Sequence, residues 1–260
     1  MDETYESFEA LKVSRDDRGI VEVRLSGLIR DNTVDRQAHK ELATVWARIE
    51  ADEEARCVFV RGSDRSLSAG GDLDFLESMV QDYGTRIEVL REARSIVTGI
   101  LSCSRPIVSA VYGSAVGAGL IPALLADISV AGTGARIMDG HTRVGLVAGD
   151  HSALIWPLLC GIAKAKMLLM LNRSLSGEEA GRIGLVSTVV DDAVVLEEAH
   201  NIAVELTELP RHATEWTKHA LNYWLRDALP IFETSLGLEF IGLGGPEAQQ
   251  AIQGMRQQLG

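Results

Sequence analysis

A polar loop near the middle of the chain carries the side chains that are best suited to proton transfer. It contains His141, Asp150 and His151, and three glycines interrupt it. A histidine titrates near neutral pH, and an adjacent carboxylate orients its ring and makes it more basic. His141 and Asp150 are nine positions apart, a spacing that allows contact without requiring it. We predict that both residues take part in catalysis.

The same loop also has structural explanations. His141 would otherwise be a histidine of a surface loop, and Asp150 would cap a helix that begins at His151 or Ser152. His151 falls on the first turn of that helix, so we expect a structural role for it. His39 lies on a helix beside Ala38 and Leu42. A histidine flanking the core is the alternative to a catalytic role for His39.

Two turns of small residues offer a backbone counterpart to these side chains. Residues 68–72 (SAGGD) and 113–119 (GSAVGAG) each follow an apolar run and precede a helical pattern. Such turns present N–H groups at a helix N-terminus and allow a ligand to approach closely. Two turns could aim two donors at one oxygen, as an oxyanion hole requires, although tight helix–strand packing is the alternative. The candidate residues are Ala69, Gly70, Gly71, Gly117 and Ala118.

Other kinds of chemistry have weaker support in the sequence. No group of His, Cys, Asp and Glu has metal-ligand spacing, so we expect no catalytic metal. Ser68 and Ser114 have no evident base, which argues against a nucleophilic serine. Neither glycine turn matches a Walker A or a complete dinucleotide-binding pattern. We expect Asp72 to cap the helix that follows it.

The pattern of apolar runs predicts an α/β core followed by a helical tail. A hairpin over 8–15 and 20–25 precedes buried strands at 57–61, 106–111, 128–131 and 185–190, with helical patterns between them. Alternating strands and helices favour parallel pairing through right-handed crossovers. After residue 196 every pattern is helical. We therefore predict a core over residues 1–195 and a tail over 196–260 that covers the core or packs on another subunit.

Composition narrows the possible partners and the compartment. The 260 residues are 46% hydrophobic, enough for one sizeable core. A net charge of −12 without a basic cluster argues against nucleic acid and anionic membranes as partners. No uninterrupted apolar run of 18 residues occurs, and no secretory signal is visible. The three scattered cysteines fit a reducing cytoplasm.

Several motifs, taken together, resemble those of one family. The segment SAGGDL at 68–73 is similar to an Ala-Gly-x-Asp-Leu motif, and PIVSAVYG at 106–113 to Pro-x-Ile-Ala-x-x-x-Gly. Gly117–Gly119, Ala126–Asp127 and the segment 175–186 follow in the same order. These residues resemble the crotonase (enoyl-CoA hydratase/isomerase) superfamily, over about residues 8–210.

The resemblance implies a fold, a ligand and an assembly. The fold would be a spiral of ββα units with a helical C-terminal region that forms a homotrimer or a dimer of trimers. The N–H groups of Gly71 and Ala118 would polarise a thioester carbonyl. A coenzyme A thioester would carry the substrate, and no cofactor would be bound permanently.

The chain departs from the family at the catalytic positions. Hydratases of the family use two glutamates, and the corresponding positions here are Ile121 and His141. The usual C-terminal Phe-x-x-Lys-Arg ending is also missing. The loop from Asp139 to Pro157 resembles that of a β-diketone hydrolase branch, which opens a camphor-derived ring, and His39 matches a histidine of that branch. A further histidine of the branch has no counterpart, and this chain keeps an AGGD turn that the branch alters.

Three hypotheses follow. The first is an acyl-CoA enzyme, a lyase or isomerase, in which the turns stabilise a thioester enolate and His141 with Asp150 moves a proton or activates water. The second is a hydrolase that cleaves a C–C bond of a cyclic β-diketone without coenzyme A. The third is a non-catalytic member that binds RNA or acts as a scaffold, and the acidic charge argues against RNA.

Overall fold

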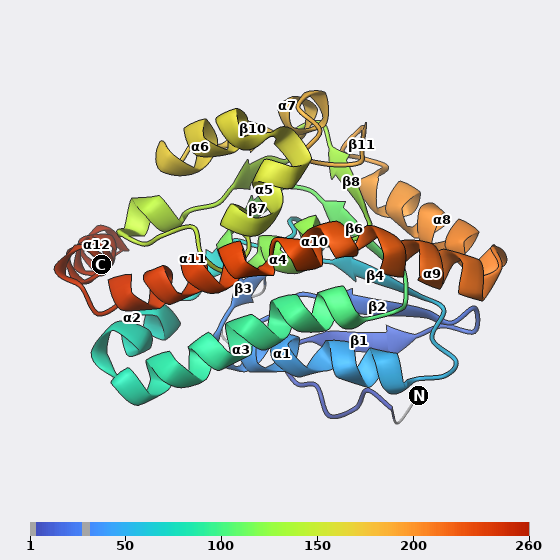
Figure 1. Cartoon of the computed structure of the whole chain (residues 1–260), viewed down its shortest axis with the longest axis horizontal. Coiled ribbons are helices and arrows are strands. Elements are labelled where there is room, and N and C mark those ends of the chain that lie inside the picture. The colour runs from blue at the N-terminus through green and yellow to red at the C-terminus, as the bar shows by residue number, and fades with distance from the viewer. Residues whose placement is uncertain (1–3, 28–31, 260) are drawn as a thin grey trace.

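A six-stranded sheet forms the centre of the molecule (Figure 1). The computed structural model describes residues 4–27 and 32–259. The first two strands are antiparallel and the others are parallel, as the alternating pattern predicts. In order across the sheet the strands are β1 (Lys12–Arg15), β2 (Ile20–Arg24), β4 (Cys57–Arg61), β6 (Ile107–Val111), β8 (Ile128–Gly132) and β11 (Thr188–Val190).

The central strand β4 shows why its sequence is apolar throughout. Val58 and Val60 belong to the larger core cluster, which includes helices α1 (Arg36–Ala51) and α3 (Tyr83–Ser102). Cys57 and Phe59 belong to a second cluster with helix α8 (Val195–Glu208). Successive side chains of a strand face opposite sides, so both faces of the sheet are covered.

Short strands frame the candidate site, and the sequence patterns do not reveal them. The first set pairs in the order β10 (Leu175–Ser176), β9 (Arg136–Met138), β7 (Ser114–Val116), and the second pairs β3 (Thr33–Val34) with β5 (Gly70–Gly71). We expected 113–119 to be only a turn and 33–51 to be only a helix. Strands of two or three residues are too short to show alternation, which explains the difference.

Helices fill the space between these strands. Asp72 caps α2, because its Oδ1 accepts from the N–H groups of Asp74 at 2.9 Å and Phe75 at 3.3 Å, as predicted. Ser176 and Glu179 form the capping box of α7. These helices are α2 (Leu73–Gln81), α4 (Leu120–Leu124), α5 (Ser152–Cys160), α6 (Ile162–Met170) and α7 (Gly177–Arg182).

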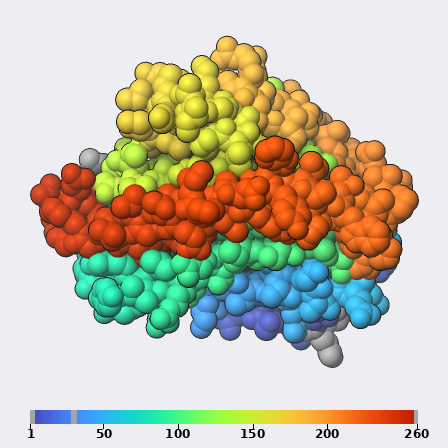
Figure 2. All heavy atoms as spheres, in the orientation of Figure 1, coloured from blue at the N-terminus to red at the C-terminus, as the bar shows by residue number. Residues whose placement is uncertain are grey.

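The helical tail lies across the core in the same chain. Figures 1 and 2 show its orange and red helices as a band over one face of the molecule. The apolar pattern over 213–226 is that of a single helix, but the chain forms two helices there, which meet at Asn222. Helix α11 packs on α3 and α5, and α12 packs on α2. The tail helices are α8, α9 (Arg211–Leu221), α10 (Tyr223–Asp227), α11 (Leu229–Gly242) and α12 (Pro246–Leu259).

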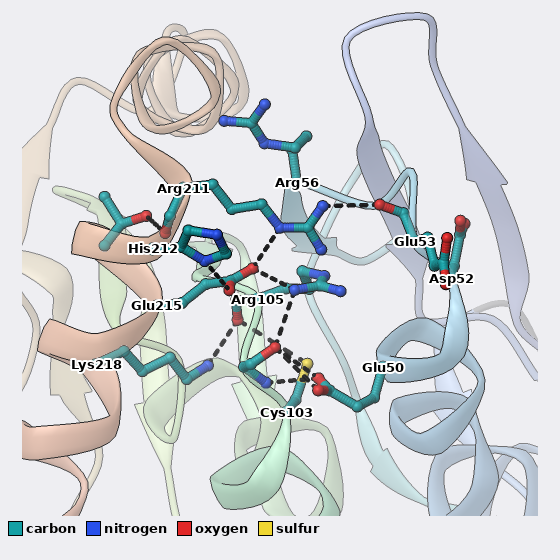
Figure 3. A network of polar contacts seen from close by, with 12 residues as sticks. Glu50, Asp52, Glu53, Arg56, Cys103, Arg105, Arg211, His212, Glu215 and Lys218 are labelled. Atoms are coloured by element: carbon teal, nitrogen blue, oxygen red, sulfur yellow. Dashed lines mark hydrogen bonds and ion pairs between the residues drawn. The ribbon is translucent and has the colours of Figure 1, made fainter.

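A buried ionic network fixes α9 to the core (Figure 3). The guanidinium of Arg105, just before β6, pairs with the carboxylate of Glu215. Arg211 Nε donates to the same carboxylate at 2.9 Å. Lys218 Nζ donates to the carbonyl of Arg105 and lies 2.8 Å from Asp127 Oδ2. Buried charges are costly unless paired, so this network holds the tail in one position against the core.

Two of the cysteines are buried in the core as free thiols. Burial raises the pKa of Cys57 to about 12 and that of Cys103 to about 11, so both thiols stay protonated and act as small apolar groups. None of the helices that the structure describes combines the length and hydropathy of a bilayer-spanning segment.

Candidate active site

One cavity brings the predicted catalytic and backbone groups together. It has a volume of about 280 Å³, and helices α2, α3 and α11 contribute to its walls with both glycine turns. Its lining includes every candidate residue of the sequence analysis: His39, Ala69, Gly70, Gly71, Gly117, Ala118, His141 and Asp150. Residues that are far apart in the chain therefore share one concave site, the usual setting of a ligand-binding pocket.

Backbone pairing places the two glycine turns side by side. Ser68 N–H donates to the carbonyl of Ser114 at 2.9 Å, and Val116 N–H donates to that of Ser68 at 3.2 Å. The turns then approach so closely that a Cβ on Gly117 would lie 3.7 Å from Gly70 Cα. Both glycines have positive φ, +98° at Gly70 and +55° at Gly117, which other residues rarely adopt.

The hydrogen bonds of the first turn narrow the choice of oxyanion donor. The N–H groups of Ala69 and Asp72 donate to the carbonyls of Asn32 and Val34, at 2.8 and 3.0 Å. Gly70 N–H donates to Ser68 Oγ at 3.1 Å. Ala69 and Gly70 therefore shape the cavity wall but use their N–H groups within the protein. Gly71 is the remaining candidate donor of this turn.

His141 lies among three carboxylates. Its Nδ1 is 3.1 Å from Asp139 Oδ2, and its Nε2 is 3.5 Å from Asp150 Oδ2 and 3.6 Å from Glu239 Oε1. The two longer distances exceed those of good hydrogen bonds, about 2.7–3.2 Å, so these contacts act through electrostatics and not through a direct hydrogen bond. Glycines in the left-handed region, Gly140 and Gly145, flank the short 3₁₀ helix His141–Val144 that carries the ring. The histidine side chain is only 11% exposed.

Burial and charge together shift the pKa values of His141 and of the three carboxylates around it. Burial alone would lower the pKa of His141, but the charges of Asp150, Asp139 and Glu239 raise it well above the ordinary value. Burial alone would raise the pKa of Asp150, yet the histidines beside it lower it well below the ordinary value. The pKa of Asp139 is lowered too, since His141 outweighs burial. His141 and Asp150 therefore form an ion pair at neutral pH.

Asp139 and Glu239 are the members of the cluster that the sequence analysis did not predict, and Glu239 is the more distant in the chain. Burial raises its pKa to about 8 against the opposing charge of His141, so it holds a proton at neutral pH. It comes from α11, where Phe232, Leu236 and Glu239 share the buried face. A carboxylate at helical spacing among buried apolar residues is unusual, and that spacing is the signal that could have identified it.

Asp150 does not cap the helix that follows it, and its side chain contacts the ring of His151. The N-cap residue of α5 is His151, without a side-chain cap, so the alternative of Asp150 as the helix cap is wrong. Asp150 Oδ1 instead lies 2.6 Å from His151 Nδ1. The other ring nitrogen lies 3.1 Å from Ser152 Oγ, which also bonds Asp139. Both nitrogens of the fully buried His151 are thus occupied within the protein, which fits the expected structural role.

The fold also creates groups that could hold a metal, which sequence spacing does not show. Ligand atoms of His141, Asp150 and Glu239 lie within 4.8 Å of one another, and so do those of Asp139, Asp150 and His151. A histidine must lose its proton to bind a metal, and the raised pKa of His141 opposes that loss. The absence of a catalytic metal stays a prediction.

Fold and site together define the class of the protein. A mostly parallel sheet, two glycine turns at one cavity and a helical tail form a crotonase fold. The chain belongs to the enoyl-CoA hydratase/isomerase family, whose model matches residues 15–234. Ile121, at the place of a hydratase glutamate by the resemblance, is buried in α4 and has no proton to exchange.

Relatives and solved structures agree with this family. The chain is 29% identical to 1,2-epoxyphenylacetyl-CoA isomerase of Escherichia coli, covering 87% of this chain and 86% of that protein. It is 33% identical to an enoyl-CoA hydratase/isomerase from Mycobacterium paratuberculosis, with a TM-score of 0.89 and coverage of 94% and 98%. A β-diketone hydrolase from Anabaena, bound to (S)-3-oxocyclohexyl acetic acid, is 26% identical, with a TM-score of 0.86 and coverage of 94% and 98%.

Proposed function

We propose that the protein transforms an acyl-CoA thioester through an enolate. The N–H groups of Gly71 and Ala118 would bind the thioester oxygen, where negative charge develops. His141, held by Asp150, would exchange the proton at the neighbouring carbon. The observation that carries this proposal is the His141–Asp150 ion pair on the same cavity as both glycine turns. Such a built site argues against the non-catalytic alternative.

The direction of proton transfer follows from the charges. With its raised pKa, His141 is an imidazolium at neutral pH and acts first as an acid. When a nucleophile adds to the β-carbon of an α,β-unsaturated thioester, the π electrons of the double bond form the enolate. The enolate electron pair then takes a proton from Nε2, a C–H bond forms, and the imidazole becomes neutral. Glu239, protonated below its pKa of about 8, adds no negative charge at this stage.

Calorimetry and turnover test this proposal. Acetyl-CoA should bind the wild-type protein with measurable heat, and acyl-CoA turnover should fall by at least 10²-fold in His141→Gln. The matched control is His212→Gln, because His212 is an exposed histidine of α9 outside the cavity. Full activity in His141→Gln would refute the catalytic role of His141. Absence of binding heat with acetyl-CoA would refute the proposal that the substrate is a coenzyme A thioester.

A second candidate is hydrolysis of a C–C bond in a cyclic β-diketone. The likeness to the Anabaena β-diketone hydrolase and the His/Asp pair favour it. Neutral His141 would take a proton from water, whose oxygen adds to one carbonyl. The C–C bond then breaks, and its electron pair forms the enolate of the other carbonyl. Cleavage of cyclohexane-1,3-dione without coenzyme A would support this candidate.

We also propose a homotrimer or a dimer of trimers in the cytoplasm. A groove between α5 and the tail, which we call the tail groove, exposes apolar side chains. These side chains would face water unless another subunit covers them. The lining of the tail groove includes Leu158, Leu159, Leu209, Leu221 and Trp224. Apolar patches of this kind commonly mark subunit interfaces. The free cysteines fit a reducing compartment.

A further inference from the structure

A second histidine lies on the cavity wall, where its neighbours are apolar. His39 lines the cavity together with Phe75, Met79, Val89 and Ala93. Its ring centroid is 5.4 Å from that of Phe75, and the residue is 5% exposed. Within residues 4–27 and 32–259, Nε2 of this ring has no hydrogen-bond partner. Because the residue is nearly buried and lines the cavity, a bound ligand is the natural partner for this nitrogen.

The other nitrogen of this ring is held by a fixed carboxylate. His39 Nδ1 lies 2.8 Å from Glu92 Oε2 of α3. Arg36 Nη1 lies 2.5 Å from the same oxygen. Burial alone would raise the pKa of Glu92, but these hydrogen bonds lower it below the ordinary value, so the group is ionised.

The ionised carboxylate determines which ring nitrogen carries the proton. A carboxylate can only accept hydrogen bonds, so Nδ1 of His39 must be the donor. In the neutral ring, Nε2 is then an acceptor. Arg36, which holds Glu92, also lies over the Phe75 ring, 6.0 Å from its centroid. This contact further restricts the movement of Arg36 and Glu92.

We infer that Glu92 is a positioning residue that holds His39 Nε2 as the acceptor for an O–H group of the bound substrate. The substrate class is then a hydroxylated or enolic acyl group, not a plain hydrocarbon chain. This inference rests on the proposed function only in that the substrate is carried by coenzyme A. The hydrogen bond between His39 and the substrate O–H group does not require coenzyme A. A site built around a buried acceptor discriminates against analogues that lack the donor.

Nitrogen NMR of the full-length protein tests the tautomer without any substrate. The ¹⁵N shifts of His39 should show a proton on Nδ1 and none on Nε2, and Glu92→Leu should populate the Nε2–H form. The matched control is Glu88→Gln, since Glu88 also contacts Arg36, at 3.3 Å, one turn before Glu92. A proton on Nε2 in the wild type would overturn the inference.

Calorimetry with two acyl-CoA probes of equal chain length tests whether the site prefers a hydroxylated acyl group. The wild type should bind 3-hydroxybutyryl-CoA roughly tenfold more tightly than butyryl-CoA, the effect of one hydrogen bond. His39→Leu should abolish this preference, because it should weaken the binding of 3-hydroxybutyryl-CoA more than that of butyryl-CoA, and Glu92→Leu should reduce the preference. Equal preference in wild type and His39→Leu would overturn the inference.

A separate pair of probes distinguishes this inference from the proposed function. If neither thioester binds the wild type, the acyl-CoA proposal fails. The same comparison is then made with cyclohexane-1,3-dione, which is enolic, and cyclohexanone. Preference for the dione that depends on His39 supports the inference, and absence of that preference overturns it.

Discussion

At the scale of single residues, the site depends on the protonation of one imidazole among three carboxylates. Asp150 is ionised, while Glu239 keeps its proton up to a pH of about 8. His141 therefore carries a positive charge between the ionised carboxylates of Asp139 and Asp150. Neutral pH then favours proton donation by His141, and higher pH favours proton abstraction.

We predict opposite pH profiles for the two candidate reactions. A group whose pKa is raised keeps its proton until the pH passes the raised value, so the protonated form of His141 is lost on the alkaline side. Acyl-CoA turnover by proton donation should fall as pH rises through that value. Cleavage of a diketone through neutral His141 should rise over the same range. Profiles of kcat/KM distinguish the two.

The variant Glu239→Gln should change the pH at which acyl-CoA turnover falls on the alkaline side of its profile, which we call the alkaline limb. Above its own pKa of about 8, Glu239 is ionised, and its charge then helps to raise the pKa of His141, so removal of that charge should shift the loss of activity to lower pH. The matched control is Glu233→Gln, because Glu233 is on the same helix and pairs with Arg94 at the surface. A limb that stays in place in Glu239→Gln would contradict the coupling.

The sequence identified part of this cluster for a physical reason. His141 and Asp150 lie in one glycine-rich loop, so local spacing was enough to suggest contact. Glu239 is 89 positions beyond Asp150, and only the packing of α11 on α5 and α3 brings it to the cavity. Likewise, the Glu92 partner of His39 depends on the contact between α1 and α3.

At the scale of elements, the glycine turns depend on each other through Ser68. The residue pairs with the backbone of the second turn, and its Oγ accepts from Gly70. It also fills the space beside Gly119, where an added Cβ would lie 2.1 Å from Ser68 Cβ. The geometry of one turn is therefore transmitted to the other through a single packed side chain.

We predict that Gly119→Ala impairs the oxyanion site. The backbone of Gly119 has helical dihedrals, so alanine is disfavoured there only by the collision with Ser68. Displacing Ser68 should lower kcat by at least tenfold and stability by about 1–3 kcal/mol, as overpacking does. Denaturant unfolding and turnover measure the two effects.

The control for this change is Gly254→Ala on α12, where an added Cβ would meet no atom within 4 Å. It should keep full activity and gain about 0.5–1 kcal/mol from better helix propensity. If Gly119→Ala behaves like this control, the turns are not coupled through Ser68.

The longer elements were predictable because periodicity needs length. β4 was placed at its observed bounds, and the helices of the core were placed within a few residues. The exceptions are the short strands and the break at Asn222 between α9 and α10, where no glycine or proline marks the change. These features arise from tertiary packing, which overrides local pattern. The division of the chain at residue 195 stays a prediction.

At the scale of the whole molecule, the tail has two faces with different chemistry. Its inner face is anchored by the Arg105–Glu215 network and supplies Glu239 to the cavity. Its outer face exposes apolar side chains, including Trp216, Trp224 and Ile241, each about 70% exposed. The tail thus supplies a side chain to the cavity of its own chain and leaves an apolar outer face exposed.

We predict that the protein sediments at three or six times the 28.1 kDa chain mass and that Trp224→Glu dissociates it. Trp224 lines the tail groove, where a carboxylate buried between subunits would lack a partner and would weaken association. Because the Arg105–Glu215 network lies within one chain, the dissociated variant should keep its helical content by circular dichroism. The control is Tyr83→Glu, an exposed aromatic residue at the start of α3, away from the groove. A wild-type protein that sediments as one chain would refute the assembly, and a Trp224→Glu variant of unchanged mass would show that subunits meet elsewhere.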